Sequence, residues 1–443
     1  MKDPLFLVGT VVIGLLIINF IVYSPVKEDA GIHSDGTPAA NINIPPALPA
    51  ENISVTGRGW AKTFGDPSYY DVASSVQQTS DGGFIIIGTT GRNASNFTSC
   101  ASTYLIKTDK DGNKVWENIF GADECISGKS AQQTSDGGYI ITGVISTPLK
   151  KVGDYSANYK SNIYLSKRDA DGNIIWEKNY TDEWGWGWTV QQTDDGGYMI
   201  LGVVLVSSNP HIYLLKIDTN GNMQWNKTFG EYYSEIGYSI QQTSDGGYIV
   251  TADTRRGIKG NEGDIHLIKT DADGNTVWDK LIDPLGQHEN DYPLDAKQTS
   301  DGGFIIIEYT EDESGTGLGD TYLLKIDPDG NMDWRKILDG FKGYLIDIAS
   351  DRGYVITGVN GNGYLIKMKT DTDGNVLWTK AIEENFSGMV SSMYYSIQQT
   401  SDGGYLVYIN QESGVWGSGH MNTDIVLVKM DETSTPRPSI EEK

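Results

Sequence analysis

The stretch Gln77–Gly88 reads QQTSDGGFIIIG, and close copies of it recur along the chain. The aspartate of its D-G-G, or the equivalent residue, falls at Asp81, Asp136, Asp195, Asp245, Asp301, Asp351 and Asp402. Successive copies lie 50 to 59 residues apart, and the sixth is the most divergent because Arg352 replaces its first glycine. Seven copies at this period predict a repeat architecture.

A second motif follows each of the first six copies. In the first copy it is Tyr104–Trp116, YLIKTDKDGNKVW, with a glycine four residues before the tryptophan. The same spacing holds at Gly112/Trp116, Gly172/Trp176, Gly221/Trp225, Gly274/Trp278, Gly330/Trp334 and Gly374/Trp378. Asp-Gly pairs supply the positive φ that a tight hairpin needs, and the β-branched runs around them favour strands. Each unit therefore predicts four strands, with S-D-G-G between the first two and D-x-D-G-N between the last two.

The two ends of the repeat region complement each other. The seventh copy has two strands within Ser396–Tyr408 and a third at Ile425–Met430, but no fourth strand follows. At the other end, Gly59–Gly65 (GWAKTFG) matches Gln224–Gly230 (QWNKTFG), so Trp60 belongs to a fourth strand without its first three. We therefore expect an all-β fold, a seven-bladed β-propeller of four-stranded blades closed by the N-terminal strand. An open solenoid is the alternative, although it would need caps rather than matched half-units.

The N-terminus differs from the repeats. Residues Leu5–Tyr23 are almost wholly apolar over 19 positions, about the length of a helix that crosses a membrane. We expect one transmembrane helix, a signal anchor at 1–24, then a Pro/Ala-rich linker at 25–57, the propeller at 58–432 and a tail at 433–443. An uncleaved anchor is favoured over a cleaved signal peptide, because no A-x-A-like site follows. The membrane is then a partner through this helix, and the propeller lies outside the cytoplasm.

The charge balance of 34 basic and 59 acidic residues gives a formal net charge of −25. Nucleic acid is excluded as a partner, because it requires basic residues to neutralise phosphate. The two cysteines, Cys100 and Cys125, map to the same face of the first blade. A disulfide would suit an extracytoplasmic setting, and two free buried thiols are the other interpretation. Six N-x-S/T sequons, at Asn52, Asn93, Asn96, Asn179, Asn226 and Asn385, are compatible with a glycosylated exported protein.

The segment from Asp109 to Trp116 resembles the tryptophan-docking motif of pyrroloquinoline-quinone-type propellers. The Q-T-S-D-G-G-Y-I and L-I-K-T-D-x-D-G-N-x-x-W patterns are similar to repeats in exported and cell-surface propellers of archaea and bacteria, over roughly Arg58 to Asp431. The resemblance implies that seven tryptophans pack between neighbouring blades: Trp60, Trp116, Trp176, Trp225, Trp278, Trp334 and Trp378. Quinoprotein dehydrogenases carry adjacent cysteines and usually eight blades, which this chain does not, so the resemblance implies architecture and no quinone cofactor.

No linear catalytic motif is present, and the five histidines are scattered: His33, His211, His266, His288 and His420. The D-x-D-G-N loops allow two interpretations. Asp109, Asp111 and Asn113 occupy the first odd positions of an EF-hand-like calcium loop, but a hairpin turn explains the same residues without metal. We expect no cofactor, with calcium as the alternative.

The long loops between the second and third strands and between blades should share one face, and function tends to reside in such loops. Candidate ligand-binding residues there are Trp184, Trp186, Tyr232, Tyr233 and Trp416. Packing of Trp186 beneath the next blade is the other interpretation. The sequence favours a binding or scaffold module with a protein, glycan or envelope partner over an enzyme. The alternative is a hydrolase or lyase acting on polysaccharide or a small molecule, which should gather His and carboxylates in the central funnel.

Overall fold

The computed structural model describes residues 10–13, 16–19, 59–66, 69–92, 102–148, 159–181, 184–230, 234–255, 263–282, 290–311, 319–338, 340–360, 365–383, 395–413 and 422–430. Every regular element in these ranges is a β-strand. The strands form seven four-stranded units, called blades 1 to 7 below.

The bounds of the strands follow the repeat. Blade 1 has β4 (Tyr70–Gln78), β5 (Phe84–Arg92), β6 (Ser102–Thr108) and β7 (Lys114–Phe120). Blade 2 has β8 (Ile126–Gln133), β9 (Tyr139–Pro148), β10 (Tyr159–Arg168) and β11 (Ile174–Tyr180). Blade 3 has β12 (Gly185–Gln192), β13 (Tyr198–Val206), β14 (Asn209–Ile217) and β15 (Met223–Phe229). Blade 4 has β16 (Ser234–Gln242), β17 (Tyr248–Arg255), β18 (Gly263–Thr270) and β19 (Thr276–Ile282).

Blade 5 has β20 (Asn290–Gln298), β21 (Phe304–Glu311), β22 (Asp320–Ile326) and β23 (Met332–Leu338). Blade 6 has β24 (Phe341–Ile348), β25 (Tyr354–Asn360), β26 (Leu365–Thr370) and β27 (Val376–Glu383). Blade 7 has β28 (Tyr395–Gln399), β29 (Tyr405–Ser413) and β30 (Asn422–Met430), and its fourth strand is β3 (Gly59–Phe64). β3 pairs antiparallel with β30, from Gly59 opposite Met430 to Phe64 opposite Ile425.

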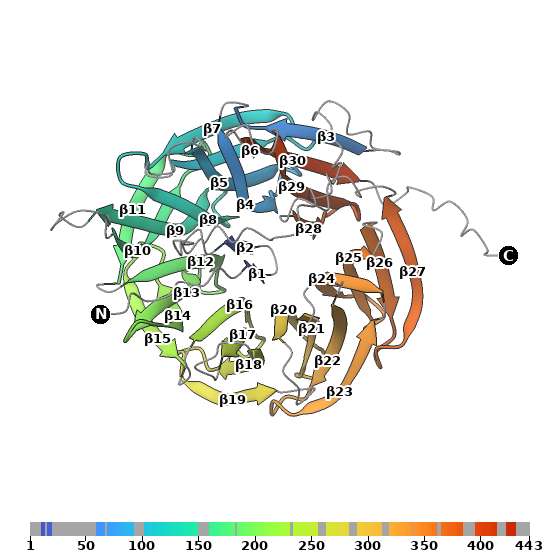
Figure 1. Cartoon of the computed structure of the whole chain (residues 1–443). Coiled ribbons are helices and arrows are strands. Elements are labelled where there is room, and N and C mark those ends of the chain that lie inside the picture. Colours follow the sequence, from blue (N-terminus) through green and yellow to red (C-terminus); the bar gives the residue numbers. More distant parts are fainter. Residues whose placement is uncertain are drawn as a thin grey trace, which may run out of the picture.

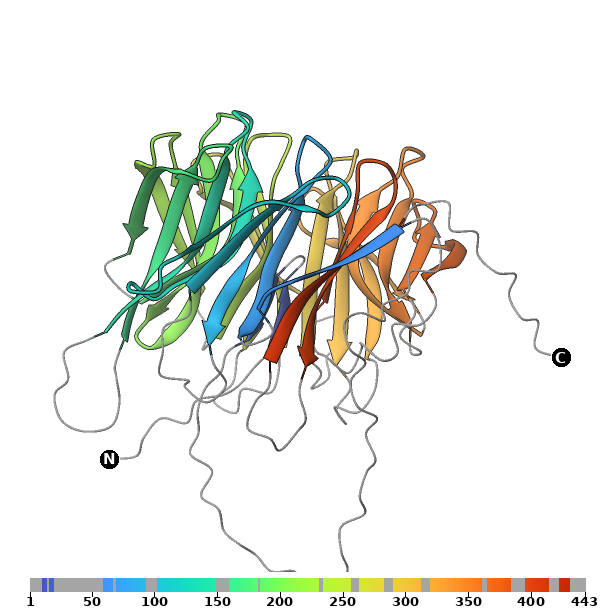
Figure 2. The same cartoon turned by 90° about the horizontal axis from the view of Figure 1, so that it is seen from above.

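The blades surround a central axis, with the first strand of each blade innermost and the fourth outermost (Figure 1). Seen from the side, the hairpin turns gather at one end of the strands (Figure 2). We call this end the turn face and the opposite end the loop face. The middle strands form the core, since Ile85, Ile86 and Leu105 are all fully buried. This all-β, propeller-like arrangement is what the repeat length and turn chemistry predicted.

The predicted transmembrane helix is wrong. The described part of the apolar N-terminal stretch forms two short strands, β1 (Thr10–Ile13) and β2 (Leu16–Asn19), which pair with each other. They lie in the middle of the ring against β4, β16, β20 and β28 (Figure 1). The Val and Ile residues of this stretch favour extended backbone, and hydropathy alone does not separate a strand from a helix. Among the described residues no helix is long and apolar enough to span a membrane, so the signal anchor and the membrane partner are not supported.

The prediction of closure also needs correction, because no sheet formed by the described residues closes on itself. Among the described residues, strand pairing joins adjacent blades at Thr423 opposite Tyr70 and at Gly263 opposite Asn290. Neighbouring blades therefore depend on side-chain contacts. The predicted linker and the C-terminal tail lie outside the described residues.

Candidate functional site

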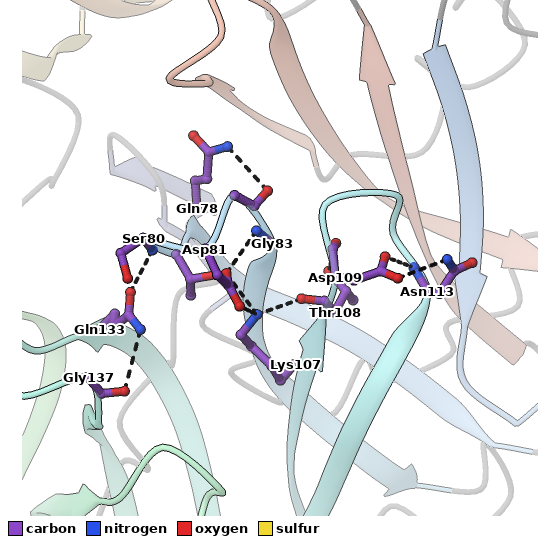
Figure 3. A network of polar contacts seen from close by, with 12 residues as sticks. Gln78, Ser80, Asp81, Gly83, Lys107, Thr108, Asp109, Asn113, Gln133 and Gly137 are labelled. Atoms are coloured by element: carbon purple, nitrogen blue, oxygen red, sulfur yellow. Dashed lines mark hydrogen bonds and ion pairs between the residues drawn. The ribbon is translucent and has the colours of Figure 1, made fainter.

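The D-G-G aspartates serve the fold. In blade 1, Asp81 forms an ion pair with the buried Lys107 of β6 at 2.8 Å and accepts hydrogen bonds from the Thr79 hydroxyl and the Gly83 N–H (Figure 3). Burial raises the pKa of Asp81, but these partners outweigh it and hold that pKa at about 2. Equivalent pairs occur in all other blades: Lys167–Asp136, Lys216–Asp195, Lys269–Asp245, Lys325–Asp301, Lys369–Asp351 and Lys429–Asp402.

The Q-Q pairs connect neighbouring blades. The first glutamine accepts a hydrogen bond from the backbone N–H of the second glutamine of the next blade, in the pairs Gln77/Gln133, Gln132/Gln192, Gln241/Gln298 and Gln398/Gln78. The second glutamine accepts from the preceding blade's turn, as Gln133 does from the Ser80 N–H at 2.7 Å (Figure 3). These backbone-directed bonds hold the inner strands together near the turn face.

The glutamine pattern breaks at blades 5 and 6. Lys297 and Asp347 stand where other blades have the first glutamine, and Ile348 replaces a second glutamine. Lys297 pairs instead with the buried Asp295 at 3.0 Å. Burial lowers the pKa of Lys297, but Asp295 outweighs that effect and the pKa is raised. Burial also raises the pKa of Asp347. The inner strands of these blades are thus the chemically distinct part of the ring.

In the D-x-D-G-N turns, the carboxylate of the first aspartate accepts hydrogen bonds from within its own turn. Asp109 Oδ1 accepts the N–H groups of Asp111 and Asn113, and its Oδ2 accepts the Asn113 side-chain amide (Figure 3). The same bonds form at Asp169, Asp218, Asp271, Asp327 and Asp371. No group of three or more His, Cys, Asp or Glu in the described ranges is arranged to hold a metal ion.

The motif tryptophans pack against glycines of the next blade. A Cβ placed on Gly112 would lie 2.5 Å from the Trp60 ring, and Trp60 also meets Phe84 edge-on at 5.8 Å. The same contact joins Trp116/Gly172, Trp176/Gly221, Trp225/Gly274, Trp278/Gly330 and Trp334/Gly374. The Lys380 ammonium lies 4.7 Å from the centre of the Trp378 ring, as Lys178 and Lys336 lie over Trp176 and Trp334, but no described glycine packs against Trp378. The chain has no D-x-D-G-N turn in blade 7 to supply the matching glycine.

Aromatic side chains gather where the inner strands of blades 3 to 6 begin, at the loop face. The first strand of each of these blades contains a β-bulge, and the residue two positions before it is Trp186, Ile236, Tyr292 or Lys342. Tyr292 stacks on Tyr309 at 6.3 Å with an interplanar angle of 21°. The Lys342 ammonium lies 3.9 Å from the centre of the Tyr309 ring. We call Trp186, Tyr292, Tyr309 and Lys342 the mouth platform; all four side chains are half-buried.

Of the five ligand residues predicted from the sequence, Trp186 belongs to the mouth platform. Trp184 is exposed and immediately precedes β12, and Trp186 is half-buried against the core that includes Trp188. Tyr232, Tyr233 and Trp416 lie outside the described residues. Sequence reasoning missed Tyr292, Tyr309 and Lys342. Trp186, Tyr292 and Lys342 each lie nine residues before a D-G-G aspartate or its equivalent, but the residue at this position differs from repeat to repeat, so the sequence gives no signal there.

A buried polar network lies behind the platform. Arg335 donates two hydrogen bonds to Glu308, at 2.7 and 3.3 Å, and Thr310 donates to both Glu308 and Asp291. Burial, followed by the neighbouring Glu308, raises the pKa of Asp291 to about 8. Asp291 and Glu308 directly adjoin Tyr292 and Tyr309 in sequence, so this network fixes the strands that carry the stacked rings.

A histidine–carboxylate array occurs elsewhere, within blade 4. His266 Nε2 lies 2.7 Å from Asp279 Oδ1, and its Nδ1 lies 3.5 Å from Glu235 Oε1. Burial lowers the pKa of His266, but the two carboxylates outweigh it and raise it to about 9. Glu235 is fully buried and His266 is 2% exposed. The array is therefore closed to solvent on the His266 side, and it crosses blade 4 from β16 to β19 instead of lining the central funnel.

No protein family model matches the chain, and none of the curated proteins compared with it matches. Among solved structures, it is similar to the polysaccharide lyase Uly1, with a TM-score of 0.53 and 12% identity over 80% of this chain and 89% of the lyase. A protein of unknown function from Bacteroides caccae aligns with a TM-score of 0.36 and 12% identity, over 67% of this chain and 92% of that one. At this identity the lyase comparison shows a shared propeller-like β fold.

Cys125 is disulfide-bonded. Cys100, the only other cysteine of the chain, lies outside the described residues, and the Cys100–Cys125 pairing stays a prediction.

Proposed function

We propose that this chain is a binding module that works outside the cytoplasm and holds a carbohydrate segment on the mouth platform. The observation that carries the proposal is the half-buried stack of Tyr292 on Tyr309 at the loop face, with the Lys342 ammonium against the Tyr309 ring. Aromatic faces of this kind bind the apolar faces of sugar rings, while Tyr hydroxyls and a lysine supply hydrogen bonds at the edges. The proposal assigns no cofactor.

Three features support it. The inner strands of blades 5 and 6, which carry Tyr292 and Lys342, depart from the repeat at their turn-face ends, and departures from a locally consistent pattern are expected in elements that carry functional sites. The disulfide of Cys125 suits an oxidising compartment outside the cytoplasm. The net charge of −25 favours a neutral ligand over an acidic one.

A lyase or hydrolase acting on polysaccharide is the second candidate. Its support is the fold shared with a polysaccharide lyase and the raised pKa values of Asp291 and His266 in the loop-face half of the ring. Both groups are buried at least nine-tenths, which favours the binding role. Incubation of the full chain with polysaccharides, followed by chromatography for shortened products, separates the two candidates. Release of oligosaccharides would overturn a purely binding role.

Titration calorimetry of the full chain with neutral oligosaccharides tests the binding proposal. Tyr309→Ala should weaken binding about tenfold, the equivalent of about 1.4 kcal/mol, since it removes one ring of the stack. Tyr69→Ala is the matched control, because Tyr69 is 43% exposed at the start of blade 1 and outside the platform. Equal losses in both variants, or no binding by the unmodified chain, would contradict the proposal.

A further inference from the structure

Two of the six sequons lie on described strands, and both are on the outermost strand of a blade. Asn179-Tyr180-Thr181 ends β11 in blade 2, and Asn226-Lys227-Thr228 lies within β15 in blade 3. Both asparagine side chains are exposed, as is Thr228. The acceptor amide therefore faces solvent at both positions.

The residues that flank each asparagine on its strand explain this orientation. Along β11 the alternate side chains turn inward and bind the next blade: Lys178 donates to the Asn220 carbonyl at 2.8 Å, and Tyr180 donates to the Gly221 carbonyl at 2.6 Å. Along β15, Lys227 donates to Asn275 Oδ1 at 3.0 Å. Successive residues of a strand point to opposite faces, so Asn179 and Asn226 are directed away from the ring.

The same two strands have exposed apolar residues on a free edge. Ile174 and Ile175 on β11 are each 56% exposed, and Met223 on β15 is 55% exposed. Asn226 Nδ2 lies 3.1 Å from the Met223 sulfur, so the acceptor amide adjoins the apolar side chain. An edge strand with apolar residues is a template for pairing with another chain unless something blocks it.

We infer that Asn179 and Asn226 carry N-linked glycans, which cover the free edges of β11 and β15. In the linking step, the asparagine Nδ2 forms a bond to C1 of a sugar carried on a diphosphate donor. The C1–O bond breaks, the diphosphate leaves with the electron pair, and the amide gives up one proton. The inference rests on the proposed placement outside the cytoplasm, where such donors act on exported chains, and not on the ligand of the mouth platform.

Peptide mass mapping of the full chain, isolated from the cells that make it, tests the inference. Peptides containing Asn179 and Asn226 should carry a sugar mass, and enzymatic release of the glycan should leave aspartate at both positions. Thr228→Ala should abolish the modification of Asn226, whereas Thr228→Ser, which keeps the sequon, should retain it. Unmodified asparagine at both positions in the isolated chain would overturn the inference. Oligosaccharide binding by that unmodified chain would leave the proposed function standing.

A second measurement tests the role of the glycans. The double variant Asn179→Gln/Asn226→Gln should self-associate more than the unmodified chain in sedimentation velocity, since both free edges are then uncovered. Release of the glycans from the folded chain should have the same effect. Glycans that are present but leave self-association unchanged on removal would overturn the assigned role in covering the edges.

Discussion

Lys107 Nζ lies 2.8 Å from Asp81 Oδ2 and joins the two halves of the repeat motif. The aspartate belongs to the turn before β5 and the lysine to β6 (Figure 3). The pair also explains the second glycine of D-G-G, because a Cβ on Gly83 would lie 2.6 Å from the same ammonium and 2.1 Å from the Thr108 carbonyl oxygen. The lysine, the aspartate and the glycine thus form one packed structural unit, which is repeated in each blade.

Replacing the lysine should destabilise the fold. Lys107→Met removes the ion pair and the hydrogen bond to the Thr108 carbonyl, and we expect a loss of about 1–3 kcal/mol in the free energy of unfolding. Lys110→Met is the control, because its ion pair with Asp111 is 71% exposed on the lysine side. Urea denaturation measures both variants. Equal effects would show that the buried pair contributes nothing beyond a surface pair.

The same aspartates should make the fold sensitive to acid. The pKa values of Asp81, Asp136, Asp245, Asp301 and Asp402 are held at about 2, below the ordinary value of 3.8. A lowered folded pKa gives stability that is present above 3.8 and lost as the pH falls through about 2. Melting temperatures should fall steeply between these values. A Lys107→Met/Lys269→Met variant should show a shallower fall, and an unchanged slope would contradict the assignment.

Two buried groups with raised pKa values should make the fold less stable as the pH rises. The pKa of Asp291 is raised to about 8 and that of His266 to about 9. For a raised folded pKa, the stability is complete below the unfolded value and lost as the pH rises through the folded one. We expect the free energy of unfolding to fall from about pH 4 to about pH 8 through Asp291, whose ordinary pKa is 3.8, and from about pH 6.5 to about pH 9 through His266, whose ordinary pKa is 6.5. Asp291→Asn should flatten the Asp291 part of this fall, which denaturant titrations at a series of pH values would detect.

Alanine substitutions at two glycines can distinguish the energetic cost of backbone strain from the cost of crowding a tryptophan ring. Gly137 (φ +85°) and Gly274 (φ +76°) share a left-handed backbone, but a Cβ on Gly137 meets nothing within 4 Å and a Cβ on Gly274 lies 2.6 Å from the Trp225 ring. Gly137→Ala should cost about 1–2 kcal/mol for the backbone alone. Gly274→Ala should cost a further ~1–3 kcal/mol from overpacking. Similar losses in thermal unfolding would show that the tryptophan ring moves away freely.

Calcium should have no effect on stability. Both carboxylate oxygens of Asp109 already accept N–H donors from its own turn, and a bound cation would have to displace them. Melting curves with EDTA and with added calcium should coincide. A higher melting temperature in calcium would favour the cation interpretation of these turns.

The sequence predicted the parts of the fold that depend on local chemistry. Asp-Gly turns, strand runs and the match between Gly59–Gly65 and Gln224–Gly230 all act over a few residues, and each has a direct counterpart in the strands. The cross-blade bonds of Gln133 and the ion pair of Lys107 were not predicted, because their partners are set by the packing of repeats. The error at Leu5–Tyr23 has a similar cause. An apolar stretch indicates that the chain avoids water, but it does not specify whether the segment forms a membrane helix or a strand within the protein.

The mouth platform was hardest to predict. Tyr292 and Tyr309 look like ordinary strand residues in the sequence, and only the β-bulge of β20 and the pairing of β20 with β21 bring their rings together. Trp184 and Trp186 were predicted because they are conspicuous aromatic residues between two repeat motifs, and Trp186 lies on β12. Side chains that are brought together only by the pairing register of two strands leave no recognisable motif in the sequence.

The pairing of β3 with β30 also determines when blade 7 can form during translation. Gly59 meets Met430, which the ribosome adds 371 residues later (430 − 59 = 371). At about 5–20 residues per second, β3 waits roughly 20–75 s for the strand it pairs with. Blades 1 to 6 each contain all four of their strands in order and need no such delay. The last blade is thus completed only when translation of the repeat region ends, and a chain truncated before Asn422 would leave Trp60 on a strand with no sheet to join.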